Sequence, residues 1–230
     1  MFGRRAPLQP LLSVESSVVL FSTPALRQKS MLGGGNILDA DWGNAATDIP
    51  KHLHNINAAM IQLTGMVGGD EAQMPVIQPL LDVMGRLTMH VGPSGTGNRI
   101  KLLHNALGAV NAVAVAESLA LCDAVGVDPR TYYEVVKNGG GMAYSTYFDR
   151  RVLRVVEGNY DPTFTLELML KDVTLATEMA GALLAHLPIL RETLGAYREG
   201  QRRGSGGEDF SAVTHALEDR LGHSLFGIRR

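Results

Sequence analysis

The sequence predicts a mainly helical protein, in which one long helix leads from a smaller part with strands into an all-helical carboxyl-terminal domain. Two short stretches, near residues 65 and 90, have the composition of strands. Over residues 98–125, apolar side chains recur at spacings of three, four and seven, which is typical of a helix with a broad apolar face. Apolar residues form 45% of the 230 residues, enough for a core, which excludes wholesale disorder.

The amino-terminal part contains few regular patterns. Residues 18–21 form a candidate buried strand, and Gly33-Gly34-Gly35 indicates a loop. Residues 48–63 tend toward a helix without clear caps, so that 1–58 as a whole is poorly defined. These residues contain no clean alternation of strands and helices.

Order becomes visible after residue 60. Residues 63–67 read as a strand, and the following Gly68-Gly69-Asp70 reads as a turn. Pro75 and Pro79 should limit the next segment to short helical pieces. Residues 87–91 then alternate apolar and polar, which predicts a strand with its apolar face buried.

Everything after Gly97 reads as helix or loop. Asp128 as cap and Pro129 in the first turn begin a second helix that ends near Lys137. Further helices are expected over residues 166–185, 188–198 and 210–221, with a flexible loop at 204–207. The last 135 or so residues should therefore be all-helical.

Charge and cysteine content exclude several classes of function. With 21 basic and 23 acidic side chains the net charge is −2, so we expect no nucleic-acid partner. The lone cysteine, Cys122, excludes an internal disulfide and is interpreted as a buried apolar residue. We expect no metal site, since His52 and His54 lie in a segment predicted to be poorly ordered, where histidines usually face solvent, and no membrane span or processed signal. The expected location is the cytoplasm.

The most informative segment runs from Gly92 to Asn105 and follows the pattern G-x-x-G-x-G-x-x-x-K-x-x-x-N. Lys101 and Asn105 are four residues apart on the predicted helix and share a face. A lysine there can exchange a proton with a substrate oxygen, and an amide beside it can hold that oxygen. Spacing alone favours the alternative of a glycine-rich turn followed by a solvated lysine and a surface asparagine.

Four stretches together carry a family resemblance. They are Met66–Asp70, the glycine segment with Lys101 and Asn105, Phe164–Asp172, and Gly207–Ala212. With these motifs in this order, the chain from about Met66 to Leu221 resembles the β-hydroxyacid dehydrogenases, the group that contains 3-hydroxyisobutyrate dehydrogenase and tartronate semialdehyde reductase.

The resemblance implies an oxidoreductase that uses NAD or NADP to transfer hydride to or from a small hydroxyacid or semialdehyde. Lys101 matches the catalytic lysine that gives or takes the proton, and Asn105 matches the asparagine that orients the substrate. Phe164 matches an aromatic residue of the substrate pocket. Lys171 matches a lysine beside the cofactor, with Asp172 as its companion. The resemblance also implies a dinucleotide-binding domain, a long connecting helix and a helical domain that forms a homodimer.

The chain departs from this family in its amino-terminal part. It has no G-x-G-x-x-G phosphate loop, and His52, Leu53 and His54 stand where the family has Ser-Gly-Gly. We therefore expect residues 1–93 to be a truncated or atypical remnant of a dinucleotide-binding domain, and 94–230 to be the substrate and dimerisation domain. The alternative function is a non-enzymatic remnant or a helical dimerisation module that has lost cofactor binding.

Overall fold

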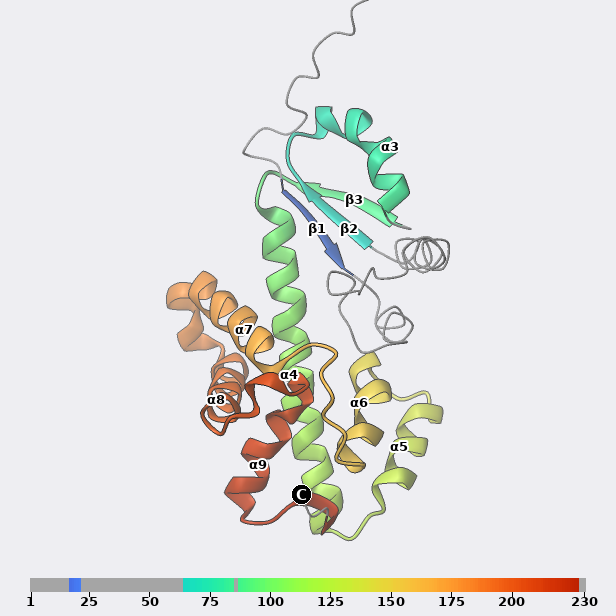
Figure 1. The fold of residues 1–230 in the computed structure, drawn as a ribbon, viewed down its shortest axis with the longest axis vertical. Coiled ribbons are helices and arrows are strands. Elements are labelled where there is room, and N and C mark those ends of the chain that lie inside the picture. Colours follow the sequence, from blue (N-terminus) through green and yellow to red (C-terminus); the bar gives the residue numbers. More distant parts are fainter. Residues whose placement is uncertain (1–16, 22–63, 85–86, 228–230) are drawn as a thin grey trace, which may run out of the picture. The chain divides into compact units, whose positions relative to one another are not determined.

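A computed structural model describes residues 17–21, 64–84 and 87–227 (Figure 1). The chain divides into two compact units, Met1–Lys101 and Leu102–Arg230, and each is described by itself. The expected loop at 33–35, the tendency toward helix over 48–63 and the substituted segment around His52 lie outside the described residues.

The described part of the first unit is a small sheet with one helix. Strand β2 (Thr64–Gly68) lies between β1 (Ser17–Phe21) and β3 (Leu87–Gly92), antiparallel to β1 and parallel to β3. Helix α3 (Met74–Met84) connects the two parallel strands, as a parallel pair requires. All three predicted strands are confirmed.

Two details of this unit correct the sequence predictions. Pro79 lies inside a single helix rather than dividing it; the carbonyl that its ring crowds and leaves without an N–H partner is that of Pro75, in the first turn of the helix. The apolar side chains of β3 are not on a buried face, since Leu87 and Met89 are 46% and 44% exposed. The buried strand is β2, whose Met66 and Val67 are 4% and 2% exposed.

The regular secondary structure in the described residues of the second unit is helical, as predicted, apart from an isolated bridge between Thr165 and Asp209. Helix α4 (Thr96–Ala124) runs into this unit from the first. Helices α7 and α8 lie on one side of α4 with α9, and α5 and α6 lie on the other (Figure 1). Their bounds are α5 (Pro129–Asn138), α6 (Thr146–Val156), α7 (Leu166–Ala180), α8 (Pro188–Arg202) and α9 (Thr214–Leu221), with short 3-10 turns η3 (Gly181–His186), η4 (Ser205–Gly207), η5 (Phe210–Val213) and η6 (Leu225–Gly227).

Helix α4 contributes to two separate hydrophobic cores. Ala109 and Ala112, both fully buried, pack with residues of α7, α8 and η5 in the first core. Leu119 packs with residues of α5, α6 and the carboxyl-terminal Leu225 in the second. The small alanine side chains allow close approach of the neighbouring helices, so this one helix organises both sides of the unit. Cys122 is buried as predicted, and burial raises the pKa of its thiol.

Burial on two faces also bears on the hydropathy of α4. Among the described residues it is the helix long and apolar enough, by length and composition, to cross a membrane, with a mean hydropathy of 1.4 over its best 18 residues. The sequence led us to expect no membrane span, yet by length and composition alone α4 passes the test for one. The core helix of a soluble protein passes the same test, and the two cores account for part of its apolar character.

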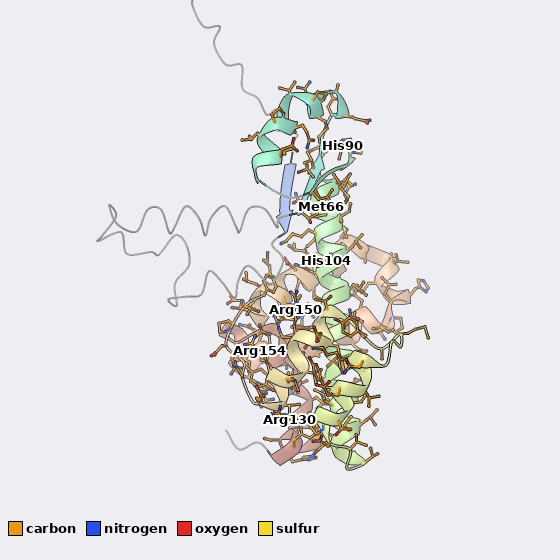
Figure 2. All side chains as sticks on the ribbon, turned by 90° about the vertical axis from the view of Figure 1, so that its right-hand side faces the viewer. Met66, His90, His104, Arg130, Arg150 and Arg154 are labelled. Carbon is orange, nitrogen blue, oxygen red and sulfur yellow. The ribbon has the colours of Figure 1, made fainter. Side chains whose placement is uncertain are left out.

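Three local features of the second unit differ from the predictions. Helix α6 was not predicted, because its sequence is dense in charge: Arg150 and Arg154 (Figure 2) flank Arg151, which the structure buries. Helix α7, predicted over residues 166–185, ends at Ala180, since Gly181 leaves the helical conformation with a φ of 52°. The expected flexible loop at 204–207 is a 3-10 turn whose Ser205 and Gly206 are buried.

Candidate active site

The centre of the candidate site is a contact between α4 and α7. The side-chain amide of Asn105 donates from Nδ2 to Oδ2 of Asp172 at 2.5 Å, across 67 residues of sequence. Asp172 is 1% exposed, whereas Asn105 is half-buried. A buried carboxylate needs such partners, because burial of an uncompensated charge is costly. The structure therefore brings together two residues that the family resemblance matches to substrate and to cofactor.

Lys171 completes this group from the same helix as Asp172. Its Nζ lies 2.9 Å from the Oδ1 of Asp172, and its side chain is 54% exposed. Helix α7 begins directly after Thr165, whose hydroxyl accepts from the backbone N–H of Leu168 and caps the helix. Asp172 thus faces the protein interior while Lys171 presents its ammonium group to solvent.

Lys101 lies on α4, four residues before Asn105. Positions four apart on a continuous helix share a face, and α4 is unbroken through both residues. Lys101 is half-buried. The predicted spacing of lysine and amide is therefore present on a real helix, and its catalytic assignment stays a prediction.

His104 is a neighbour that the sequence prediction missed. Its Nδ1 lies 3.1 Å from the Oδ1 of Asn105, so the Asn105 side chain is contacted at both its nitrogen and its oxygen. His104 is exposed on α4, where Figure 2 labels it. The available signal was its place directly before Asn105 in the motif.

Phe164 lies in a different group of side chains. Its ring meets Phe210 edge to face, with centroids 6.1 Å apart, and its carbonyl oxygen accepts from the backbone N–H of Phe210 at 2.8 Å. The ring of Tyr147 packs against that of Phe210, with centroids 5.4 Å apart. The Arg151 guanidinium lies over the Phe210 ring, 5.2 Å from its centroid. The predicted pocket residue is thus held by the motif at 207–212.

Asp209 anchors that motif. It is fully buried and accepts from Arg151 Nε at 2.9 Å and from the hydroxyls of Thr163 and Ser211 at 2.7 and 2.8 Å. The backbone N–H groups of Thr163 and Ser211 also donate to it. Burial by itself would raise the pKa of this carboxyl, but Arg151 and the hydrogen bonds outweigh burial and lower the pKa. Asp209 therefore fixes the segment that carries Phe164.

Other features of the described residues do not compete for the role of active site. A hollow of about 660 Å³ along α5 is wide open to solvent and contains none of the predicted site residues. It is lined by Asp128, Arg130, Thr131, Glu134, Val135, Asn138 and Gly139. The described part of the chain holds no group of three or more histidine, cysteine or acidic residues arranged for a metal ion.

Comparison with known proteins assigns the chain to a family. The family model described as "NAD-binding of NADP-dependent 3-hydroxyisobutyrate dehydrogenase" matches residues 95–217, more than half of the chain. This chain belongs to the β-hydroxyacid dehydrogenase family. The matched β-hydroxyacid dehydrogenase region includes Lys101, Asn105, Phe164, Lys171 and Asp172, and it ends within α9.

Individual β-hydroxyacid dehydrogenases are similar over most of the chain. A 2-(hydroxymethyl)glutarate dehydrogenase from Eubacterium barkeri is 33% identical over 82% of this chain and 62% of its own length. A 2-hydroxy-3-oxopropionate reductase from Escherichia coli is 28% identical over 98% of this chain and 75% of its own. The solved 3-hydroxyisobutyrate dehydrogenase from Salmonella typhimurium is 30% identical, with a TM-score of 0.62 over 70% of this chain and 56% of that structure.

The chain thus spans about three fifths of the length of the first of these relatives. The family is shown by this similarity.

Proposed function

We propose that this chain acts as an NAD(P)-dependent 3-hydroxyacid dehydrogenase, with a small hydroxyacid or the corresponding semialdehyde as substrate. The observation that carries the proposal is the group of Asn105, Asp172 and Lys171, which joins α4 to α7. It gathers an amide donor, a buried carboxylate and an exposed ammonium group from two motifs far apart in sequence. Family membership supports the same reaction.

Lys101 is the proposed proton donor and acceptor. In the oxidation, the carbinol carbon loses a hydride, the hydroxyl oxygen loses its proton to the neutral amine of Lys101, and a carbonyl forms. The reduction reverses both transfers. An amine suits this role because its pKa can be tuned toward neutrality, whereas a guanidinium stays protonated. Asn105, one turn along the same helix, would donate an N–H to the reacting oxygen.

The residues around Lys171 fit a bound nicotinamide dinucleotide, either NAD or NADP. When bound, that group supplies the hydride acceptor for oxidation or the hydride donor for reduction. Lys171 is more than half exposed while its counter-ion Asp172 is buried, so its ammonium is held in place and open to a ligand. We assign Lys171 and Asp172 to the cofactor and Phe164, fixed by Phe210, to the substrate.

We also propose that the protein is a cytoplasmic homo-oligomer. Leu103, Leu107 and Leu121 of α4 are 59%, 63% and 67% exposed, and large exposed apolar side chains on one helix are typical of an interface. A second copy of this chain is the proposed occupant, since most soluble oligomers are symmetric. Light scattering should give at least a dimer mass, reduced toward the monomer by Leu107→Glu. A wild-type monomer mass that does not change with concentration would contradict this proposal.

The catalytic proposal is tested by replacing Lys101 and a matched control. Turnover is measured with NAD, NADP and a series of short 3-hydroxyacids and semialdehydes. Lys101→Met should lower kcat by about a hundredfold or more, because general acid–base catalysis contributes roughly that much. Arg99→Met, on an exposed position of the same helix, should leave kcat unchanged. Near-full activity of Lys101→Met would show that the catalytic assignment is wrong.

The same assays distinguish the proposed dehydrogenase from the alternative, a dimerisation module without cofactor binding. A wild-type chain that dimerises but neither binds NADH or NADPH nor turns over any of these compounds would favour the dimerisation module. Cofactor binding is followed by the fluorescence of the reduced nicotinamide, so that binding and turnover are measured separately.

A further inference from the structure

The Asn105 carboxamide lies between two side chains of opposite hydrogen-bonding character. On one side its Nδ2 is 2.5 Å from Oδ2 of Asp172, and on the other its Oδ1 is 3.1 Å from Nδ1 of His104. His104 and Asn105 are adjacent on α4, whereas Asp172 comes from α7. The amide is therefore held from two directions.

The chemistry of Asp172 decides which way this amide points. Asp172 is 1% exposed and has the Lys171 ammonium 2.9 Å from its other oxygen, the environment of an ionised carboxylate. An ionised carboxylate only accepts hydrogen bonds, so the group facing it must be the amide nitrogen of Asn105. The amide oxygen then faces His104.

The orientation of the amide in turn decides the protonation of His104. An amide oxygen is an acceptor only, so a hydrogen bond to it requires a proton on the Nδ1 of His104. We propose that His104 is a positioning residue, which donates through Nδ1 and, together with Asp172, holds the Asn105 carboxamide in one orientation. A neutral imidazole free in water favours the opposite tautomer, with its proton on Nε2. The Nδ1–H tautomer is therefore a signature of this contact.

This arrangement has a consequence for the ligand that Asn105 recognises. One N–H of the amide is committed to Asp172, and the second N–H is the group it can offer outward. Toward a substrate Asn105 is thus presented as a donor, which fits a carbonyl, alkoxide or carboxylate oxygen and disfavours an ammonium group. This consequence rests on the proposed function, whereas the tautomer of His104 does not.

Nuclear magnetic resonance of the full chain tests the tautomer without any activity measurement. Histidine ring nitrogens are labelled with 15N and observed at about pH 8.5, where ordinary imidazoles, with a pKa of about 6.5, are neutral. Of the seven histidines, the His104 signal is the one lost in His104→Asn. It should show the proton on Nδ1, and Asn105→Leu should shift it toward Nε2. A proton on Nε2 in the wild type, or no change in Asn105→Leu, would overturn the proposal.

Two matched replacements of His104 test its effect on the reaction. The side-chain nitrogen of asparagine is as far along the side chain as Nδ1 of histidine, whereas that of glutamine corresponds to Nε2. His104→Asn should keep kcat/KM within about twofold, and His104→Gln and His104→Leu should lower it about tenfold, the effect of one hydrogen bond. Thermal unfolding midpoints should agree among the three. Equal kcat/KM for the asparagine and glutamine variants would contradict positioning through Nδ1.

The two experiments separate the two proposals. If the wild-type chain has no dehydrogenase activity, the proposed function fails, and the nitrogen shifts of His104 still confirm or overturn its contact with Asn105. If the chain is active and His104 carries its proton on Nε2, the positioning proposal alone fails.

Discussion

Two buried aspartates in the helical unit differ in the partners that surround them. Asp209 is 0% exposed and receives donors that are themselves largely buried, among them Arg151 at 8% exposure. Asp172 is 1% exposed, yet its partners Lys171 and Asn105 extend toward solvent. A buried charge enclosed by protein donors stabilises a fold, whereas one whose partners face outward can present them to a ligand. We therefore assign Asp209 to structure, whereas the outward-facing partners of Asp172 support its proposed role at the cofactor.

The largest expected effect is the loss of the charge on Asp209. Asp209→Asn keeps the shape of the side chain but leaves the Arg151 guanidinium buried without its counter-ion. Breaking one partner of a buried ion pair costs about 3–5 kcal/mol, so the free energy of unfolding should fall by that amount in urea titrations. Asp161→Asn, at an exposed position of the same unit, is the control and should change stability little. A loss below about 1 kcal/mol would place Asp209 outside the structural role.

The same replacement at Asp172 should have a smaller effect on folding and a larger one on function. In Asp172→Asn the Lys171 ammonium can return to water, so the expected loss of stability is about 1–3 kcal/mol, mainly from the altered contact with Asn105. Affinity for NADH or NADPH should weaken in parallel, as measured by nicotinamide fluorescence. Equal losses of stability in Asp172→Asn and Asp209→Asn would remove the distinction between the two aspartates.

Lowering the pH should reduce the stability of the folded protein through protonation of Asp209. The pKa of Asp209 is lowered in the folded protein, so it contributes stability that is fully present above the ordinary aspartate pKa of about 3.9. That contribution is lost as the pH falls through the lowered pKa. Urea midpoints measured from about pH 5 downward should therefore fall more steeply in the wild type than in Asp209→Asn. Parallel curves would indicate that another carboxyl dominates acid unfolding.

The smallest expected effect on stability belongs to Lys171. Its ammonium is 54% exposed, and ion pairs with an exposed partner contribute about 0–1 kcal/mol, so Lys171→Ala should barely change the unfolding midpoint. Its KM for NAD or NADP should nevertheless rise, with kcat less affected. Lys171→Arg keeps the positive charge and is the matched control, expected to recover part of the cofactor affinity. An unchanged KM in Lys171→Ala would exclude Lys171 from the cofactor site.

Elements that depend on neighbouring residues were predicted from the sequence, whereas those that depend on distant contacts were not. Helix α4 and the cap of α5 by Asp128 were predicted because periodicity and capping are local in sequence. Helix α6 was missed because Arg151 is buried by a partner 58 residues away, which no local pattern reveals. The turn at 204–207 was expected to be flexible, yet Gly206 packs so closely on Gln201 that a Cβ there would meet its side chain at 2.6 Å.

In the candidate site, too, the sequence predicted the local spacing of residues and the structure alone revealed the long-range contacts. The spacing of Lys101 and Asn105 on one helix, and the adjacency of Lys171 and Asp172, were determined by the sequence alone, since a helical repeat relates near neighbours. Only the tertiary structure decided that Asn105 meets Asp172, that Asp172 is buried while Lys171 is exposed, and that Arg151 pairs with Asp209. These contacts depend on how α4, α6 and α7 pack. Packing arises from the summed burial of many side chains across the whole unit, which no single motif contains.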